Sequence, residues 1–230
     1  MLLLQEYVND PCGTLSIPYW KSKELAVPQN MKIIHDRDFS VGMLRGYKDE
    51  PYFRLSHNLK NIGQVFLNDV EPVSDSSNIN EFVWLINASY SDISITKEQI
   101  ESYRRTPVYC PDLWILFKEQ NSNNIVAGGI ADYDRETNEL ILEWIQVLPH
   151  YRRKGYGQLI VNSLLLKMQG IAEFATVSGK VNNPTNPQSL YRKCGFIGDD
   201  VWHILTQKWS FKFPFIGTLK NPLQSKGILV

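Results

Sequence analysis

Three short, mostly apolar runs in the middle of the chain, separated by polar residues, predict β-strands. These runs are Leu113–Lys118, Ile125–Tyr133 and Leu140–Leu148, and each has the length of a strand. Polar residues fill positions 121–124 and 134–138 between them. Because such short polar turns join neighbouring strands, the pattern predicts an antiparallel meander.

Two helices are predicted ahead of the meander. The first covers Glu81–Ser89, where three apolar residues recur at helical spacing on one face: Phe82, Leu85 and Ile86. Asn78 or Asn80 has the right side chain to cap it. The second helix begins after Thr96, which has acidic and amide residues close behind it, and it runs to about residue 105.

The most informative stretch is Leu142–Met168, where an apolar strand enters a short turn that opens directly into an amphipathic helix. The turn contains three cations and two glycines: Arg152, Arg153, Lys154, Gly155 and Gly157. Glycine lets the backbone approach a ligand closely, and the free N–H groups and dipole of a helix start favour a phosphate. The pattern predicts a pocket for a phosphorylated ligand at the carboxyl end of a strand.

A further strand, Phe174–Val177, follows that helix and completes a βαβ unit. Next, Asn186 followed by proline suits the start of a short helix, and Gly195 suits the position just beyond its end. Two closing strands are then predicted, Phe196-Ile197 and Val201–Trp209, with a turn at residues 198–200 between them.

The length of 230 residues accommodates one domain of ~150 residues with a sizeable extension, or two small domains. Residues 62–209 are predicted to form the main domain, which begins with a strand at 62–71. Residues 1–61 combine several prolines with aromatic anchors and are predicted to form an N-terminal extension or a small subdomain. The tail at 210–230 is left unassigned.

Composition and charge limit the functional classes. Lys+Arg and Asp+Glu are equal at 24 each, so no net field attracts nucleic acid or an anionic membrane surface. Apolar runs are too short for a membrane span or a signal peptide. Three cysteines lack metal-ligand and disulfide spacing, which fits a reducing compartment. We therefore expect a cytoplasmic protein without a metal, and the sequence leaves a homodimer open.

Two separated motifs resemble those of the GNAT superfamily of acetyl-CoA-dependent N-acetyltransferases. Arg152-x-x-Gly155-x-Gly157, after a strand ending at Val147, is similar to its motif A, and Leu190–Phe196 (LYRKCGF) is similar to its motif B. A glycine motif alone is weak evidence, whereas both motifs in this order and context are a strong combined signal. The resemblance implies a mixed α/β fold (an α+β mixed sheet) whose two central parallel strands splay apart around acetyl-CoA.

The same resemblance implies roles for individual residues. The pyrophosphate would be held largely by backbone N–H groups of six successive residues: Arg152, Arg153, Lys154, Gly155, Tyr156 and Gly157. The strand that carries Ile145 and Val147 would pair its backbone with the pantetheine arm, and Tyr191 would protonate the departing thiolate. Family members often have asparagine seven residues before this tyrosine, where this chain has Pro184. Three neighbours are open as substitutes: Asn182, Asn183 and Asn186.

Two side chains are candidates for the proton transfers. Glu143 interrupts the apolar strand, where an unpaired buried charge is costly, and alternation places it on the face of Ile145 and Val147. It suits a base that takes a proton from an incoming ammonium, directly or through water; pairing with a buried arginine or exposure at a strand edge explains it equally well. For Tyr191 we favour the acid role over plain packing, because a phenol with a pKa of ~10 can reprotonate a thiolate of pKa ~8.5.

The sequence thus predicts direct transfer of an acetyl group from acetyl-CoA to a primary amine of a small molecule or a peptide. A sensor that binds acetyl-CoA without turnover is the alternative. A dinucleotide-binding enzyme is disfavoured, because Ser178-Gly179-Lys180 follows the strand where an acidic residue is needed. Cys194 is predicted to be buried rather than nucleophilic, and His203 to be structural. Residues 82–90, the strand aromatics Trp114 and Tyr133, and the N-terminal extension are candidate walls of the acceptor pocket; the aromatic side chains are equally explained as plain core.

Overall fold

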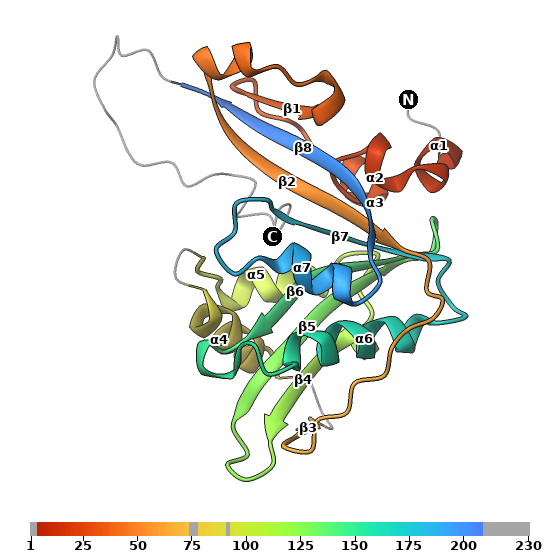
Figure 1. Ribbon diagram of the computed structural model, residues 1–230, viewed down its shortest axis with the longest axis vertical. Helices are drawn as coiled ribbons and strands as arrows, with labels where there is room; N and C mark the ends of the chain where they lie inside the picture. Colours follow the sequence, from red (N-terminus) through yellow and green to blue (C-terminus); the bar gives the residue numbers. More distant parts are fainter. Residues whose placement is uncertain (1–3, 74–77, 91–92, 209–230) are drawn as a thin grey trace. The chain divides into compact units, whose positions relative to one another are not determined.

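The computed structural model describes residues 4–73, 78–90 and 93–208 (Figure 1), and the predicted tail at 210–230 lies outside these ranges. The chain has the mixed α/β architecture that the sequence predicts. It groups into two compact units, of which the first consists of residues 1–56, 176–188 and 197–230. The second consists of residues 57–175 and 189–196. The division at residue 61 remains a prediction.

The first unit is built on strands in the order β1-β8-β2-β7. Their bounds are Met31–His35 for β1, Tyr47–His57 for β2, Phe174–Lys180 for β7 and Ile197–Gln207 for β8. β8 pairs antiparallel with β1 and with β2. The short helices α1 (Leu4–Asn9), α2 (Pro11–Thr14) and α3 (Tyr19–Ser22) precede the strands, and two 3-10 turns, Asp36–Asp38 and Val41–Arg45, follow β1.

Arg54 on β2 fastens the N-terminal helices to this unit. Its side chain is 2% exposed, and its guanidinium donates to the Pro11 carbonyl at 3.1 Å and to the Tyr7 hydroxyl at 2.8 Å. The indole N–H of Trp202 on β8 adds a bond to the Cys12 carbonyl at 2.8 Å. Since a buried charge is tolerated only where its donors are satisfied, these bonds make the N-terminal segment part of the fold rather than an appendage.

The prediction of two closing strands around a turn at residues 198–200 is wrong. β8 is one strand of 11 residues, because β2 offers partners along its length, from Tyr47 opposite Gln207 to Ser56 opposite Ile197. A register irregularity between Arg54 and Ser56 and a left-handed φ of 109° at Gly198 accommodate the residues that suggested a turn.

The second unit contains the predicted meander, with strands in the order β6-β5-β4-β3. Their bounds are Val70–Pro72 for β3, Trp114–Glu119 for β4, Ile125–Asp134 for β5 and Glu139–Val147 for β6. Antiparallel pairing of β4 with β5 and of β5 with β6 confirms the meander. The predicted strand at 62–71 is wrong except at its end: only β3 pairs, with β4, and Phe66 is 81% exposed, so no partner buries its apolar positions.

Helix starts follow the capping signals of the sequence. Asn78 caps α4 (Ile79–Ser89), and a complete capping box of Thr96 and Gln99 opens α5 (Lys97–Tyr103). The later helices are α6 (Tyr156–Met168) and α7 (Pro187–Lys193). Two 3-10 turns, Pro111–Leu113 and Pro149–Tyr151, precede β4 and follow β6.

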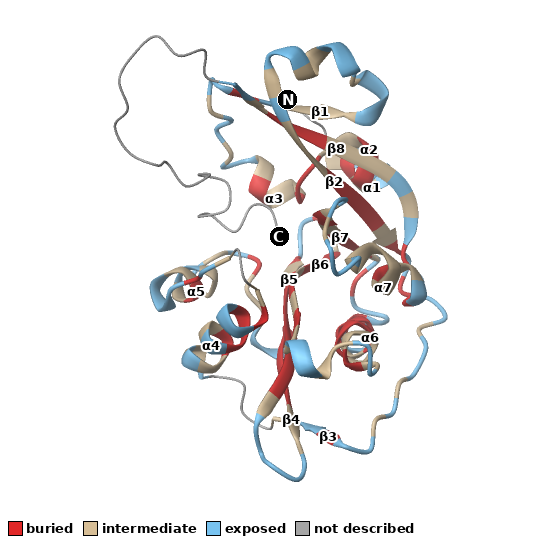
Figure 2. Cartoon of the chain, turned by 60° about the vertical axis from the view of Figure 1, so that its left-hand side comes forward, coloured by how far each residue is buried: buried red, intermediate tan, exposed pale blue. Residues whose placement is uncertain are grey.

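Two consecutive glycines in β5 let helices approach both faces of this sheet. A Cβ on Gly128 would lie 2.8 Å from a Leu85 methyl of α4, and one on Gly129 would lie 2.6 Å from an Ile160 methyl of α6. Neighbouring residues of a strand point to opposite faces, so α4 and α6 cover opposite sides. Figure 2 shows α4 and α5 on one side of β5 and α6 on the other, with the strand buried between them.

Candidate functional site

A β-bulge at Glu143 interrupts β6 halfway along. Its neighbours Leu142 and Trp144 lie opposite consecutive residues of β5, so Glu143 itself is the inserted residue. An inserted residue resets the alternation of a strand. The register gives Glu143 no partner on β5, so the face it was expected to share with Ile145 and Val147 stays a prediction.

The half-buried carboxylate of Glu143 lies near the end of α5. Burial raises the pKa of the Tyr103 phenol, and the negative charge of Glu143 raises it further. A cation in the place of Glu143 would lower the pKa of Tyr103 instead, so the charge that acts on this phenol from Glu143 is negative.

Between the bulge and the end of β6, the side chains of Tyr90 and Arg152 form hydrogen bonds with backbone carbonyls of the strand. Leu148 donates its N–H to β5 at 3.0 Å, so by alternation the polar groups of Ile145 and Val147 lie on the edge away from β5. The Tyr90 hydroxyl donates to the Ile145 carbonyl at 3.3 Å, and Nε of Arg152 donates to the Val147 carbonyl at 3.2 Å. We call the edge of β6 that points away from β5 at residues 145–147 the outward edge of β6.

The turn between β6 and α6 has the backbone geometry of an anion site. Arg153 and Gly155 adopt left-handed φ values of 66° and 95°, and Gly155 is the N-cap of α6. The first α-helical bond runs from Leu159 to the Gly155 carbonyl at 3.0 Å, so the three N–H groups before Leu159 have no acceptor within the helix. A left-handed residue followed by helical ones turns successive N–H groups toward one point, which favours an anion.

The three cations of this turn have different surroundings. The guanidinium of Arg152 joins two backbone carbonyls, those of Val147 on β6 and Ser89 at the end of α4. Arg153 and Lys154 are exposed, with the Lys154 ammonium 5.1 Å from the centre of the Tyr151 ring. Arg152 thus braces the site, while the other two supply positive charge at its rim.

Tyr156, between the two glycines, faces the interior. It is 1% exposed, and its hydroxyl donates to the carboxylate of Asp69. Burial raises the pKa of this phenol, and the bond to Asp69 raises it further. Its side chain therefore holds the turn in place, and only its backbone N–H is available to a ligand.

Gly157 joins the two sequence motifs in space. A Cβ at this position would lie 2.9 Å from a Leu190 methyl, so the glycine lets Leu190 of α7 pack closely on the start of α6, and a larger residue would force that side chain to shift. Leu190 precedes Tyr191, which is 7% exposed. Burial, then the neighbouring Tyr90 and Cys194, raise the pKa of Tyr191, so this phenol keeps its proton at neutral pH.

Three further residues considered in the sequence analysis are Asn183, Asn186 and Cys194. Asn183 and Asn186 lie in the first unit, where the Asn183 side-chain oxygen accepts from both the N–H and the hydroxyl of Thr185 at 2.9 and 2.8 Å. Their contact with pantetheine stays a prediction. Burial raises the pKa of Cys194 to about 12, which keeps it as a weakly nucleophilic thiol.

His203 lies in the first unit, between two aspartates. Its ring nitrogens are 2.8 Å from a carboxylate oxygen of Asp49 and 3.1 Å from one of Asp36. The ring of Phe39 stacks on it with the centroids 3.7 Å apart. Both nitrogens are therefore satisfied within this unit, as expected of a structural histidine.

Sequence reasoning overlooked three residues that the fold brings to this region. Tyr103 and Asp69 carried no motif, because their partners Glu143 and Tyr156 lie far away in the chain. Tyr90 was grouped with the aromatic residues of its helix, whereas its hydroxyl contacts β6. Its place directly after the helix end was the available signal, since a residue there can turn away from the helix axis.

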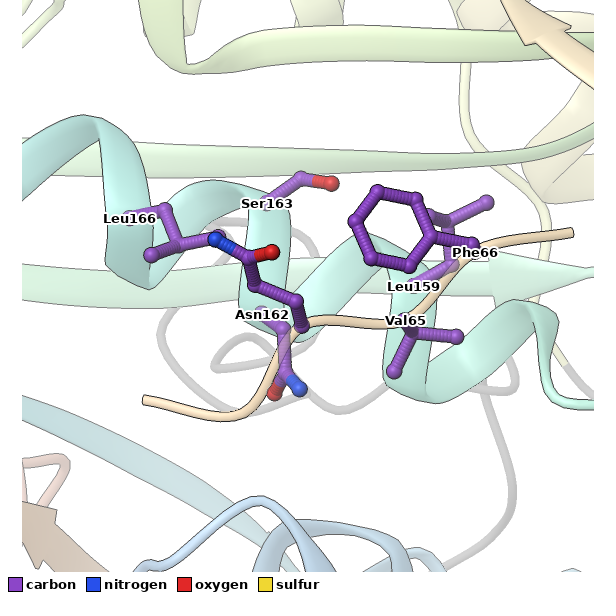
Figure 3. A pocket seen from close by; sticks show the side chains of 7 residues that line it. Val65, Phe66, Leu159, Asn162, Ser163 and Leu166 are labelled. Carbon is purple, nitrogen blue, oxygen red and sulfur yellow. The ribbon is translucent and has the colours of Figure 1, made fainter. Parts of the chain in front are cut away.

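A separate groove of 210 Å³ lies along α6 (Figure 3). It is lined by residues of α6 and of the loop between β2 and β3: Gln64, Val65, Phe66, Leu159, Asn162, Ser163 and Leu166. None of these side chains titrates, so the groove offers no acid or base. Among the described residues, no cluster of His, Cys, Asp or Glu could hold a metal ion, and no helix is long and apolar enough to cross a membrane.

Part of the chain matches a known family model. Residues 112–197 match the family model of the acetyltransferase (GNAT) domain, a range that includes the bulged strand, the basic glycine turn and Tyr191. A search of curated proteins finds no match.

Solved structures with the same fold include a GCN5-related N-acetyltransferase from Sphaerobacter thermophilus, at 16% identity and a TM-score of 0.59; the match covers 81% of this chain and 63% of that one. A GNAT-family acetyltransferase from Colwellia psychrerythraea is 16% identical with a TM-score of 0.54, over 76% of this chain and 64% of that one. A protein of unknown function from Staphylococcus epidermidis is 13% identical with a TM-score of 0.55, over 91% and 82%. The chain thus spans less than two thirds of the first two proteins.

Proposed function

We propose that the chain is a cytoplasmic N-acetyltransferase that uses acetyl-CoA and a primary amine of a small molecule or peptide, a proposal supported by the match of residues 112–197 to the acetyltransferase (GNAT) domain. The observation that best supports this activity is the close packing of Leu190 on Gly157. It joins the helix of Tyr191 to the start of α6, so a proton donor and an anion site belong to one unit. A homodimer stays a prediction.

The residues of the turn fit the phosphates of acetyl-CoA. The first N–H groups of α6, which have no acceptor within the helix, point to a common centre, and the exposed cations Arg153 and Lys154 lie at its rim. The outward edge of β6 presents backbone groups suited to an extended chain with amide bonds. When bound, acetyl-CoA supplies an acetyl group activated as a thioester.

The side chains of this unit then divide the proton transfers. Glu143, or a water beside it, takes a proton from the ammonium nitrogen, which frees the lone pair for attack on the thioester carbon. A carbon–nitrogen bond forms, the carbon–sulfur bond breaks, and the second proton that the nitrogen loses as the amide forms passes to solvent. Backbone N–H groups on the outward edge of β6 stabilise the negative charge that develops on the acetyl oxygen. Tyr191 gives its proton to the departing sulfur and later recovers one from solvent.

The raised pKa of Tyr191 is compatible with this role, because the phenol is protonated at every physiological pH. A thiolate that forms in the same buried surroundings is also destabilised, which favours proton transfer to it. The negative charge near Tyr103 and Glu143 supports a cationic amine as the acceptor.

The test uses the protein with acetyl-CoA and a panel of amines, with free thiol release as the readout. We expect release with at least one amine, and a loss of roughly 10²–10⁴-fold in Tyr191→Phe without loss of acetyl-CoA binding. Tyr133→Phe is the matched control, because that hydroxyl bonds to Asn138 at 3.1 Å at the far end of β5. Binding of acetyl-CoA with no turnover on any amine would instead favour the sensor.

A further inference from the structure

Tyr90 leaves α4 and turns onto β6. As the residue that follows the helix, it has an extended backbone with φ −123° and ψ 143°. Its ring packs edge-on against Trp144 with centroids 6.1 Å apart, and its hydroxyl lies on the Ile145 carbonyl of the outward edge. Arg152 binds the carbonyls of both Ser89 and Val147, and it thereby holds the residue before Tyr90 near the end of β6.

The bond from Tyr90 to Ile145 is a weak one. Its length of 3.3 Å exceeds the usual 2.7–2.8 Å of O–H···O bonds. By contrast, the guanidinium of Arg152 is anchored at two carbonyls and is less easily displaced. Of the two side chains on the outward edge, Tyr90 is therefore the one that a competing donor would replace.

We propose that Tyr90 is a gate on the outward edge of β6, whose hydroxyl is exchanged at the Ile145 carbonyl for an amide N–H of an incoming extended ligand. This rests on the proposed function, since the pantetheine arm of acetyl-CoA is such a ligand. An amide N–H donates to a backbone carbonyl in the manner of an added strand. The exchange breaks one hydrogen bond and forms another, without covalent change.

Once released from the Ile145 carbonyl, the Tyr90 hydroxyl is free to act near Tyr191. Tyr90 already affects the titration of Tyr191, so the two phenols lie within electrostatic reach. A hydroxyl freed from Ile145 can donate toward Tyr191 or toward the sulfur that Tyr191 protonates. Tyr90 is a positioning residue in this account, and it couples occupancy of the strand edge to the state of the proton donor.

Calorimetric titration with two probes tests the gate. Coenzyme A carries the pantetheine arm, whereas adenosine 3′,5′-bisphosphate carries phosphates but no such arm. In Tyr90→Phe the ring stays on Trp144 and only the competing hydroxyl is lost. We expect coenzyme A to bind about two- to tenfold more tightly, the effect of one net hydrogen bond, and the bisphosphate to bind as in the wild type.

Tyr133→Phe is the control, because its hydroxyl also meets a backbone carbonyl, that of Ile171 at 3.4 Å, and it should change neither affinity. Weaker or unchanged binding of coenzyme A by Tyr90→Phe overturns the gate, as does an equal change for both probes. If the wild type binds the bisphosphate as well as it binds coenzyme A, the gate fails while the anion site stands. If it binds neither probe, the proposed function fails and the gate fails with it.

Discussion

Replacing Gly155 by alanine tests the anion site at the start of α6 most directly. Gly155 has a φ of 95°, where an L-residue is strained, and an added Cβ would be 3.5 Å from the nearest side-chain atom, in Leu67. The cost is therefore backbone strain rather than a clash. For a residue forced into left-handed conformation this is about 1–2 kcal/mol, or a fall in Tm of roughly 2–8 °C.

The effect on binding follows from relief of the same strain. If the substituted residue relaxes toward negative φ, the N–H groups at the helix start no longer converge, and one charge-assisted bond is lost at about 1.5–3 kcal/mol. Affinity for coenzyme A should therefore fall roughly ten- to a hundredfold. Urea denaturation and calorimetric titration of the same preparations measure the two effects separately.

Gly170→Ala is the matched control for this variant. Gly170 has a φ of 77° just beyond the other end of α6, and its added Cβ would meet no heavy atom within 4 Å. It should lose similar stability and keep its affinity. Equal affinity loss in both variants, or full affinity in Gly155→Ala, would show that the turn does not hold the phosphates.

Further expectations concern neighbouring residues. Tyr156→Phe leaves the Asp69 carboxylate without its donor and should lower the free energy of unfolding by about 1–3 kcal/mol in urea. Because burial raises the pKa of Tyr191, the folded protein holds that proton more tightly than the unfolded chain; stability should therefore fall as pH rises above ~10, and less steeply in Tyr191→Phe. Glu143→Gln should slow thiol release by roughly 10²–10⁴-fold if the carboxylate is the base, and a normal rate would leave water in that role. Cys194, with a pKa of about 12, should resist alkylation at pH 8 until the protein is unfolded.

Local features of the fold were predictable because their causes lie within a few residues. The capping box at Thr96 and the left-handed Gly195 depend on neighbouring positions, and the structure has both. Strand boundaries in the meander were close for the same reason. The closing strand failed because its continuity depends on β2, more than a hundred residues earlier in the chain.

Within the candidate site, the bulge at Glu143 could not be read from the sequence, since it is defined by which residues of β5 lie opposite. Gly157 was assigned to close approach of a ligand, which stays a prediction; the structure adds that Leu190 fills the space where a Cβ would lie. Arg152 was expected to offer its backbone N–H to the phosphate, and the structure shows in addition that its guanidinium binds two carbonyls. Each of these depends on a partner remote in the sequence.

The sequence by itself determined the order of elements, the basic glycine turn and the two motifs that indicate the acetyltransferase family, because these depend on short-range periodicity and on residue types at fixed spacing. Only the tertiary structure decided which partners the side chains of this region have. It showed that Arg152 braces the turn, that Tyr156 faces Asp69, and that Tyr90 lies on the outward edge of β6. The reason is physical: a side chain's role is set by the atoms packed around it, and folding brings those atoms from distant parts of the chain.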